Sequence, residues 1–324
     1  MHSFEELQKY TKNLIDKQNF IKQPLTLYEP IDYTMRLGGK MIRPLLTIIA
    51  ADMLGAELKA ADNAAVAIEL AHNFTLLHDD IMDQSPLRRG KPTVYQKYGT
   101  EKAILSGDVM LAMAYKYLLQ YDKDKVQALT QTLTSVLINV CEGQAYDMDF
   151  ELRSDVSKRE YITMISLKTG ILLAGALKLG AIIAGAKAED INALNEFGLY
   201  LGIAFQLQDD ILDCWSNLDD FGKVTGSDIV DNKKTILFLT ALDKAEDEDM
   251  QELISWYLTK TTDFQKKKER VKDLFEKYEV RKDVENTINQ YIDVALNSLN
   301  KVSLEEEKKA NLRILTEKLI NRNK

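Results

Sequence analysis

Cysteine is nearly absent from this sequence, since Cys141 and Cys214 are the only two among 324 residues. Two cysteines cannot supply a disulfide framework, and neither stands in a Cys-x-x-Cys pair of the kind that holds zinc. Such sparse use of cysteine is typical of proteins that fold in a reducing compartment. We therefore expect a cytoplasmic protein.

Proline is also scarce, and basic residues are outnumbered by acidic ones. The five prolines all lie within the first 92 residues, so the rest of the chain is free of the residue that most strongly interrupts helices. Lys and Arg number 42 against 50 Asp and Glu, which gives a formal net charge of −8. Proteins that bind nucleic acids normally present a basic face, so we expect no nucleic-acid partner. An anionic ligand would have to be attracted by local basic residues or by a metal ion.

Long apolar runs are missing as well. The N-terminal residues mix acidic and basic side chains without the apolar core of a signal peptide, so none is expected. The longest apolar stretch, GILLAGALKLGAIIAGA at 170–186, has 17 residues and is interrupted by Lys178, whereas a membrane span needs about 20. We expect no membrane span. Because its small residues allow close helix packing, this stretch is predicted to be a core helix.

Helical periodicity is what the sequence does contain. Apolar residues recur at three- and four-residue spacing, as on one face of a helix; near the C-terminus they are Val284, Ile288, Tyr291, Ile292, Ala295 and Leu299. Breaks are expected at 85–93, 216–228 and 243–250. No Ser/Gly-rich linker divides the chain, so we predict an all-α fold with residues 1–324 as one domain. The lysine run 266–268 is expected to lie on a solvated helix face.

Two similar octets, LLHDDIMD at 76–83 and QLQDDILD at 206–213, are the most unusual feature of the chain. On a helix of 3.6 residues per turn, the first and last aspartates of each octet project from the same face. The simplest alternative is that each cluster is a solvated helix end. Against this alternative, apolar residues precede both clusters, and the predicted helices end just after them, where the helix dipole disfavours negative charge.

Carboxylates this close raise one another's pKa unless a cation compensates. Oxygen ligands without thiolate or imidazole favour a hard divalent ion, and Mg²⁺ is usually held by one or two carboxylates plus substrate phosphate oxygens. An EF-hand calcium loop is excluded, because its sixth and twelfth positions counted from Asp79 are Gln84 and Gly90 instead of Gly and Glu. Two such helices facing each other would hold a metal cluster and a diphosphate between them.

Basic residues accompany each acidic octet. Arg88, Arg89 and Lys91 follow the first, while Lys223, Lys233 and Lys234 follow the second; GGKMIRP at 38–44 adds Lys40 and Arg43. Arginine suits bidentate phosphate binding, and lysine acts as a mobile point charge. Each group by itself is more often a surface loop than a site. Together with the two acidic octets, they predict two sites for polyphosphate groups.

These motifs in this order resemble those of the trans-isoprenyl diphosphate synthases, the polyprenyl synthetase family. The resemblance runs from GGKMIRP to the KKT near residue 235, through DDIMDQSPLRRGKPT, GDVMLAMAY (107–115), GQAYDMD (143–149), the Lys168-Thr169 pair and GIAFQLQDDILD. It implies a helical bundle around a central cavity, the isoprenoid synthase type I fold. A single DDxxD motif would also suit a terpene cyclase.

The resemblance implies a role for each matching residue. Asp79, Asp83 and Asp209 would ligate three magnesium ions, supported by Asp80, Asp210 and Asp213. The allylic diphosphate would be held by Arg88, Lys168, Lys223 and Lys233, and isopentenyl diphosphate by Lys40, Arg43, His72 and Arg89. Thr169 and Gln206 would lie near the reacting carbons. His72 has separate support, because it stands seven residues before Asp79 and so on nearly the same helix face.

The implied reaction is a prenyl transfer that needs no nucleophilic side chain. Metal and basic residues stabilise the departing diphosphate, and the double bond of isopentenyl diphosphate attacks the resulting allylic cation. In this family an aromatic residue five positions before the first motif limits products to short chains, so Phe74, with its neighbour Thr75, favours C15 or C20. Because the motif reads DDxxD without the two-residue insertion usual in bacterial farnesyl synthases, we expect C20 geranylgeranyl diphosphate. The alternatives are C15 farnesyl diphosphate, a longer polyprenyl product, a terpene cyclase or a non-catalytic synthase subunit. A homodimer is expected from the family.

Three positions depart from the family pattern. Met41 replaces an arginine, Val224 stands where proline is common, and Leu237 replaces a proline. None of these changes removes an expected ligand.

Overall fold

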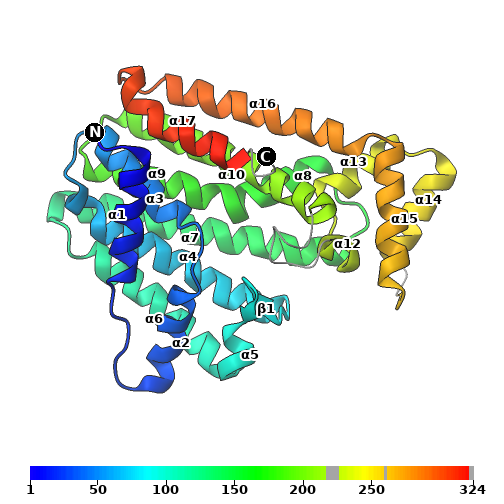
Figure 1. The fold of residues 1–324 in the computed structure, drawn as a ribbon, viewed down its shortest axis with the longest axis horizontal. Coiled ribbons are helices and arrows are strands. Elements are labelled where there is room, and N and C mark those ends of the chain that lie inside the picture. Colours follow the sequence, from blue (N-terminus) through cyan, green and yellow to red (C-terminus); the bar gives the residue numbers. More distant parts are fainter. Residues whose placement is uncertain (217–225, 259–260, 321–324) are drawn as a thin grey trace. The chain divides into compact units, whose positions relative to one another are not determined.

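A computed structural model describes residues 1–216, 226–258 and 261–320 (Figure 1). The chain divides into two compact units. Unit 1 comprises Met1–Asn139, Ile171–Leu199 and Ala295–Lys324, and unit 2 comprises Val140–Gly170 and Tyr200–Val294. The prediction of one domain stays a prediction, and each unit is described by itself below.

Unit 1 is built from helices and one very short hairpin. Its elements are α1 (Phe4–Asp16), α2 (Leu25–Arg36), α3 (Ile42–Met53), η1 (Leu58–Ala61), α4 (Asp62–Met82), β1 (Leu87–Arg88), β2 (Lys91–Pro92), α5 (Val94–Tyr98), α6 (Thr100–Leu118), α9 (Ile171–Ile183) and α17 (Glu306–Ile320). It also contains the first parts of α7 (Lys123–Leu152) and α10 (Ala188–Trp215), and the end of α16 (Val280–Asn300).

Unit 2 contains the remaining parts of α7, α10 and α16 together with shorter helices. These are α8 (Lys158–Ile165), the π-helical turn η2 (Ser166–Gly170), α12 (Ser227–Val230), α13 (Ile236–Lys244), α14 (Asp247–Leu258) and α15 (Phe264–Lys277). The all-α prediction is therefore confirmed for the described part of the chain.

The apolar stretch at 170–186 forms α9, as predicted for a core helix. Residues Leu172–Leu177 are all buried, and Gly180 lies so close to α3 that an added Cβ would stand 2.3 Å from the Thr47 carbonyl oxygen. Among the described helices, the continuous segment Lys158–Ile183 is long and apolar enough to cross a membrane, and 61% of its most apolar window is buried. Core helices of globular proteins meet the same criterion, so this is weak evidence for a span.

Helix α16 and the lysine run give one confirmation and one correction. The predicted stripe on α16 is largely buried, with Val284 and Ile288 at 1% and 2% exposure and Ala295 and Leu299 at 0%. The prediction of a solvated face for lysines 266–268 is wrong for Lys267, which is 1% exposed on α15. Helical periodicity places Lys267 on the same face as the apolar Val271.

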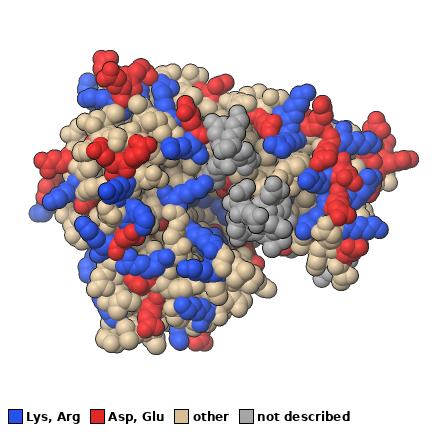
Figure 2. All heavy atoms as spheres, viewed as in Figure 1, with Lys and Arg blue, Asp and Glu red and all other residues tan. Residues whose placement is uncertain are grey.

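Figure 2 shows acidic and basic side chains interspersed over the visible face of the molecule instead of segregated into one basic surface.

Candidate functional site

The first aspartate motif ends α4 in unit 1, as the sequence predicts. Asp80 is buried at 3% exposure, Asp79 is partly exposed, and Asp83 is exposed and caps the C-terminus of the helix. The backbone N–H of Asp83 donates to the Asp79 carbonyl oxygen at 2.8 Å, so the helical turn between these two residues is intact. Their carboxylates therefore occupy one face, while Asp80 points into the protein.

Asp80 is paired with Arg88. The guanidinium group donates to both carboxylate oxygens, with Nη2–Oδ1 at 2.6 Å and Nε–Oδ2 at 2.9 Å. Arg88 is brought back to α4 by the β1–β2 hairpin, whose turn residues Arg89 and Gly90 both have positive φ angles, 54° and 72°, as a tight two-residue turn requires. The sequence predicted Arg88 as a diphosphate ligand. In this structure its guanidinium group donates to Asp80, and the diphosphate role stays a prediction.

A basic cluster lies on the neighbouring part of unit 1. Arg43, at the start of α3, donates from Nη1 to His72 Nε2 at 3.0 Å, so this nitrogen must be the unprotonated acceptor. The other ring nitrogen, Nδ1, is buried and has no hydrogen-bond partner. Burial, then the charges of Arg43 and Arg89, lowers the pKa of His72 well below that of free histidine. A neutral imidazole with an unpaired N–H among arginines suits an anionic ligand.

A glycine and a buried glutamate shape this cluster. The guanidinium of Arg89 packs on Gly39, where an added Cβ would lie 2.7 Å from its Cζ atom. Glu69 on α4 is 6% exposed and accepts a hydrogen bond from Asn73 at 3.1 Å. Burial raises the pKa of Glu69 and the two arginines Arg43 and Arg89 oppose that rise. The sequence did not single out Glu69; its position three residues before His72, on the same helix face, was the available signal. Lys40 is exposed just ahead of α3.

The two predicted chain-length residues lie on the same helix. Phe74 is 9% exposed, and its ring meets the ring of His78 edge-on with a centroid distance of 4.8 Å. His78 in turn occupies the space that Gly107 of α6 leaves open, because a Cβ there would stand 2.4 Å from His78 Nε2. The Thr75 hydroxyl donates to the His72 carbonyl oxygen at 2.8 Å, which turns it back toward its own helix.

The second aspartate motif lies on α10, in unit 2. Asp209 is partly exposed, whereas Asp210 is 3% exposed and accepts a hydrogen bond from the Tyr161 hydroxyl at 2.5 Å. Burial, followed by the charge of Asp228, raises the pKa of Asp210 well above that of free aspartate. A bound cation would reverse that effect. Burial raises the pKa of Tyr161 as well, so Tyr161 remains a donor to this carboxylate.

Asp213 organises the chain that follows the motif. Its carboxylate accepts hydrogen bonds from the Ser227 hydroxyl at 2.6 Å and from the Asp228 backbone N–H at 3.0 Å. Its backbone carbonyl accepts from the Gly226 N–H at 2.6 Å. Asp213 therefore fixes the start of α12.

Lys168 and Thr169 lie on the π-helical turn η2. Lys168 Nζ donates to Asp147 Oδ2 at 2.5 Å, and the Thr169 hydroxyl donates to Gln206 Oε1 at 3.0 Å. Glycines flank the turn on both sides, since a Cβ at Gly143 would meet the Lys168 backbone nitrogen at 2.5 Å and one at Gly202 would meet Gly170 Cα at 2.5 Å. Turns of this type occur frequently at functional sites.

Most of the predicted residues of unit 2 surround one cavity of about 100 Å³. Its lining includes the acidic residues Asp147, Asp210 and Asp228, the basic residues Lys168, Lys233 and Lys234, and also Thr169, Gln206 and Tyr161. Gln206 links the groups, because its amide donates to Asp210 Oδ1 at 3.2 Å. Lys223 lies outside the described residues. The sequence did not assign roles to Asp147, Tyr161 or Asp228, although Asp147 stands within the GQAYDMD motif.

The six motif aspartates fall into two groups of three. Asp80, Asp210 and Asp213 are buried and bonded to protein groups, whereas Asp79, Asp83 and Asp209 remain accessible. The family resemblance predicts Asp79, Asp83 and Asp209 as metal ligands and the other three as supporting residues, and these roles stay predictions. Across residues 1–216, 226–258 and 261–320, no group of three or more His, Cys, Asp or Glu side chains is placed to hold a metal by itself. Accessible carboxylates completed by phosphate oxygens are the donor set that suits Mg²⁺, so the residues fit this ion.

Comparison with known proteins gives one consistent family. A family model described as polyprenyl synthetase matches residues 24–275. The geranylgeranyl diphosphate synthase of Methanosarcina mazei is 42% identical over 232 residues, which is 71% of this chain and 72% of the relative. The geranylfarnesyl diphosphate synthase of Natronomonas pharaonis is 40% identical over 261 residues, 75% of this chain and 76% of the relative.

A solved structure agrees with these relatives. The crystal structure of a geranylgeranyl pyrophosphate synthase has a TM-score of 0.95 and 42% sequence identity, and the match covers 100% of both chains. The fold is thus the all-α isoprenoid synthase fold. From the ordered motifs, the accessible aspartates and these matches together, the chain belongs to the polyprenyl synthetase family, as a trans-prenyltransferase that makes isoprenyl diphosphates.

Proposed function

We propose that this chain condenses isopentenyl diphosphate with allylic diphosphates up to C15 and releases all-trans geranylgeranyl diphosphate and inorganic diphosphate. The observation that carries the proposal is the full-length match, at 42% identity, to a geranylgeranyl pyrophosphate synthase. The division of the motif aspartates into accessible and buried triplets supports it.

Magnesium belongs to the proposal, since the family depends on it. Asp79, Asp83 and Asp209 would hold the ions, three in number as the family resemblance implies. Bound there, magnesium would neutralise the charge that develops on the leaving diphosphate. The buried residues Asp80, Asp210 and Asp213 would hold the C-terminal ends of α4 and α10 in position through their hydrogen bonds.

Basic residues of each unit would hold the substrates. Lys168, Lys223 and Lys233, with Arg88, would bind the allylic diphosphate and favour ionisation of its C–O bond by stabilising the departing anion. Arg43, His72, Arg89 and Lys40 would bind isopentenyl diphosphate, and the unpaired His72 Nδ1–H is available for a phosphate oxygen. The allylic C–O bond breaks, a C–C bond forms to the isopentenyl double bond, and loss of a proton restores an alkene.

Thr169 and Gln206 would act at the reacting carbons. Their side chains are bonded to each other at 3.0 Å and line the cavity with Lys168 and Lys233. Neutral oxygens in this position can stabilise a nearby allylic cation without trapping it as a nucleophile would.

Product length is the finer part of the proposal. Phe74 is held edge-on by His78 and is almost fully buried, so it would form the floor against which a C20 chain stops. A C25 product is the second candidate, because one relative of similar identity is a geranylfarnesyl diphosphate synthase.

A homodimer is the proposed assembly. In the unit 2 part of α7, exposed apolar or small residues recur at spacings of four, three and four: Cys141, Ala145, Met148 and Leu152. Met148 is 47% exposed and Leu152 91%. Apolar residues at this spacing are typical of a helix that packs on a partner helix. The sparse use of cysteine, two residues in 324, supports a reducing, cytoplasmic location.

The test is a product assay with the purified chain, Mg²⁺, isopentenyl diphosphate and a C5, C10 or C15 allylic diphosphate. We expect C20 diphosphate from all three primers, and none when EDTA replaces Mg²⁺. A hydrocarbon product would indicate a terpene cyclase, and no condensation with any primer would contradict the proposed function. Activity that appears only after a second synthase subunit is added would indicate a non-catalytic partner.

A further inference from the structure

We propose that Lys267 is a positioning residue, which together with Lys234 fixes the segment Gly226–Thr235 so that Asp228 and Lys233 face the cavity of unit 2. Neither ammonium group would touch substrate, since that of Lys267 donates to Asn232 and that of Lys234 to carbonyl oxygens at the end of α7. The effect on catalysis rests on the proposed function, whereas the effect on the segment does not.

The segment is anchored at its start by the second aspartate motif. Asp213 holds Ser227 and Asp228 through its carboxylate, as described above. The short helix α12 then ends at Val230, and two residues later Asn232 has a φ angle of +60°. The backbone N–H of Lys233 donates to the Asp228 carbonyl oxygen at 2.9 Å, so the two cavity-lining residues are tied to each other.

Lys267 anchors the middle of the segment. Its Nζ donates to Asn232 Oδ1 and reaches the Val230 carbonyl oxygen at 3.5 Å. The same ammonium group lies 5.1 Å from the ring centroid of Tyr257. A cation at the C-terminal end of α12 meets carbonyl groups that have no helical partner. Asn232 tolerates the left-handed conformation better than most residues, and Lys267 holds its side chain.

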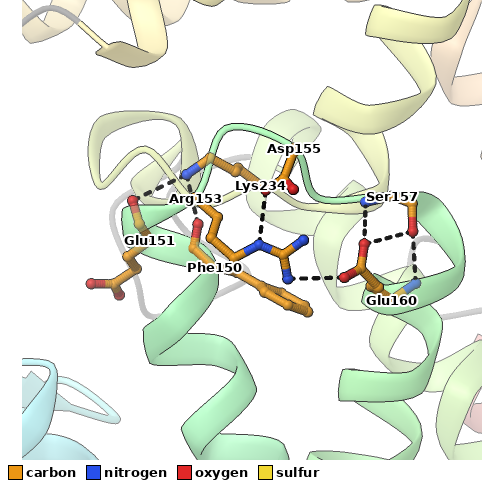
Figure 3. A network of polar contacts seen from close by, with 7 residues as sticks. All are labelled: Phe150, Glu151, Arg153, Asp155, Ser157, Glu160 and Lys234. Atoms are coloured by element: carbon orange, nitrogen blue, oxygen red, sulfur yellow. Dashed lines mark hydrogen bonds and ion pairs between the residues drawn. The ribbon is translucent and has the colours of Figure 1, made fainter.

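Lys234 anchors the end of the segment. Its Nζ donates to the carbonyl oxygens of Phe150 and Glu151, at 2.7 and 3.1 Å, at the C-terminus of α7 (Figure 3). The chain after α7 is ordered by its own network, in which Arg153 pairs with Asp155 and Glu160. The side chains of Ser157 and Glu160 form a capping box at the start of α8. Lys234 is thus attached to a well-defined helix end.

The two adjacent lysines of the DNKKT stretch would then have different tasks. Lys233 lies between the anchors at Asn232 and Lys234, so its backbone is held on both sides while its side chain stays at the cavity. Such fixed placement matters, because loss of an accurately positioned cation weakens stabilisation of the leaving diphosphate.

Burial of an ammonium group would be unfavourable unless its partners repay the cost. Lys267 is 1% exposed, and burial lowers its pKa to about 8. A leucine or methionine would fill the same space on α15 at lower cost. The hydrogen bonds of Lys267 to Asn232 and Val230 therefore account for a charged side chain at this buried position.

The experiment compares Lys267→Met, Lys234→Met and the control Lys266→Met, which alters an exposed lysine of the same helix. The first readout is amide hydrogen exchange without substrate. We expect Lys267→Met and Lys234→Met to exchange at least about tenfold faster within residues 226–235, with the rest of the chain and the control unchanged. Unchanged exchange in the segment, or an equal increase throughout the chain, would overturn the proposal.

The second readout is steady-state kinetics. For Lys267→Met we expect the KM of the allylic diphosphate to rise about tenfold, because a tenfold change corresponds to the loss of roughly one hydrogen bond to a charged group. The KM of isopentenyl diphosphate should stay the same. Equal changes in both values would indicate a purely structural role and overturn the proposal. If the wild-type chain shows no condensation, the proposed function fails, and the exchange result still decides the role of Lys267.

Asn232→Gly provides an independent check, because glycine accepts the positive φ angle but lacks the side-chain oxygen. If Lys267 acts through Asn232, the double variant Lys267→Met/Asn232→Gly should exchange in the segment no faster than Lys267→Met alone. Independent, multiplicative effects would contradict the proposed contact.

Discussion

At the residue scale, His72 shows how burial sets the state of a binding group. Arg43 can only donate, so His72 Nε2 accepts, and the ring is neutral at pH 7 because its pKa is well below that of free histidine. Below about pH 6.5, the unfolded chain therefore binds a proton at His72 that the folded chain does not bind. The contribution of His72 to the free energy of unfolding is fully present above about pH 6.5 and is lost as the pH falls below that value.

We predict that His72→Gln makes stability less dependent on pH. The free energy of unfolding of the wild type should fall by up to about 1.4 kcal/mol per pH unit below pH 6 through this group, and the variant should lack this component. Urea unfolding at pH 5.5 and 7.5 measures the difference. An identical pH dependence in both proteins would show that His72 is protonated when folded.

Phe74→Ala should lengthen the product. Removal of the ring opens space beside His78 on α4, so elongation should continue past C20 to C25 or longer. Chromatography of products from the C15 primer measures this, with the wild-type chain as the reference. An unchanged C20 product would place the floor of the product site at another residue.

Local spacing predicted which motif residues share a helix face but could not predict their partners. The exposure of Asp79 and Asp83 follows from the helix period. The pairing of Asp80 with Arg88 depends on a hairpin that returns the chain to α4, and the burial of Lys267 depends on a segment more than 30 residues earlier in the chain. Such contacts are set by tertiary packing, which periodicity does not report.

At the scale of elements, helix type and helix ends follow from sequence, whereas irregular turns do not. The core position of α9 and the buried stripe of α16 were predictable from apolar spacing. The π-helical turn at Lys168 and Thr169 was not, because it results from close packing against Gly143 and Gly202.

Gly180→Ala should destabilise the packing of α9 on α3. The new methyl group would stand 2.3 Å from the Thr47 carbonyl oxygen and 2.8 Å from Ala50 Cβ, so one helix must move. We expect a loss of about 1 to 3 kcal/mol in the free energy of unfolding. Lys178→Ala, at a partly exposed position of the same helix, should change it by no more than about 0.5 kcal/mol. Urea unfolding distinguishes the two; equal small effects would mean that α9 and α3 do not approach this closely.

At the scale of the whole molecule, the proposed homodimer predicts a sensitive position on α7. Met148→Glu would place a charge in the exposed apolar stripe, so the variant should shift toward monomer in sedimentation velocity. Lys282→Gln alters net charge by the same amount at an exposed position of α16 and should leave the assembly unchanged. A wild-type monomer, or an unaffected Met148→Glu dimer, would contradict the proposed interface.

We propose that both aspartate motifs serve one magnesium-dependent ionisation, although they stand 130 residues apart in sequence. The most direct measurement is the condensation rate of Asp79→Asn, Asp209→Asn and the double variant at saturating Mg²⁺ and substrates. Each single change should lower kcat by on the order of 100-fold or more, and the double variant should lose far less than the product of the two. A strictly multiplicative loss, or a single variant with undiminished kcat, would contradict the claim.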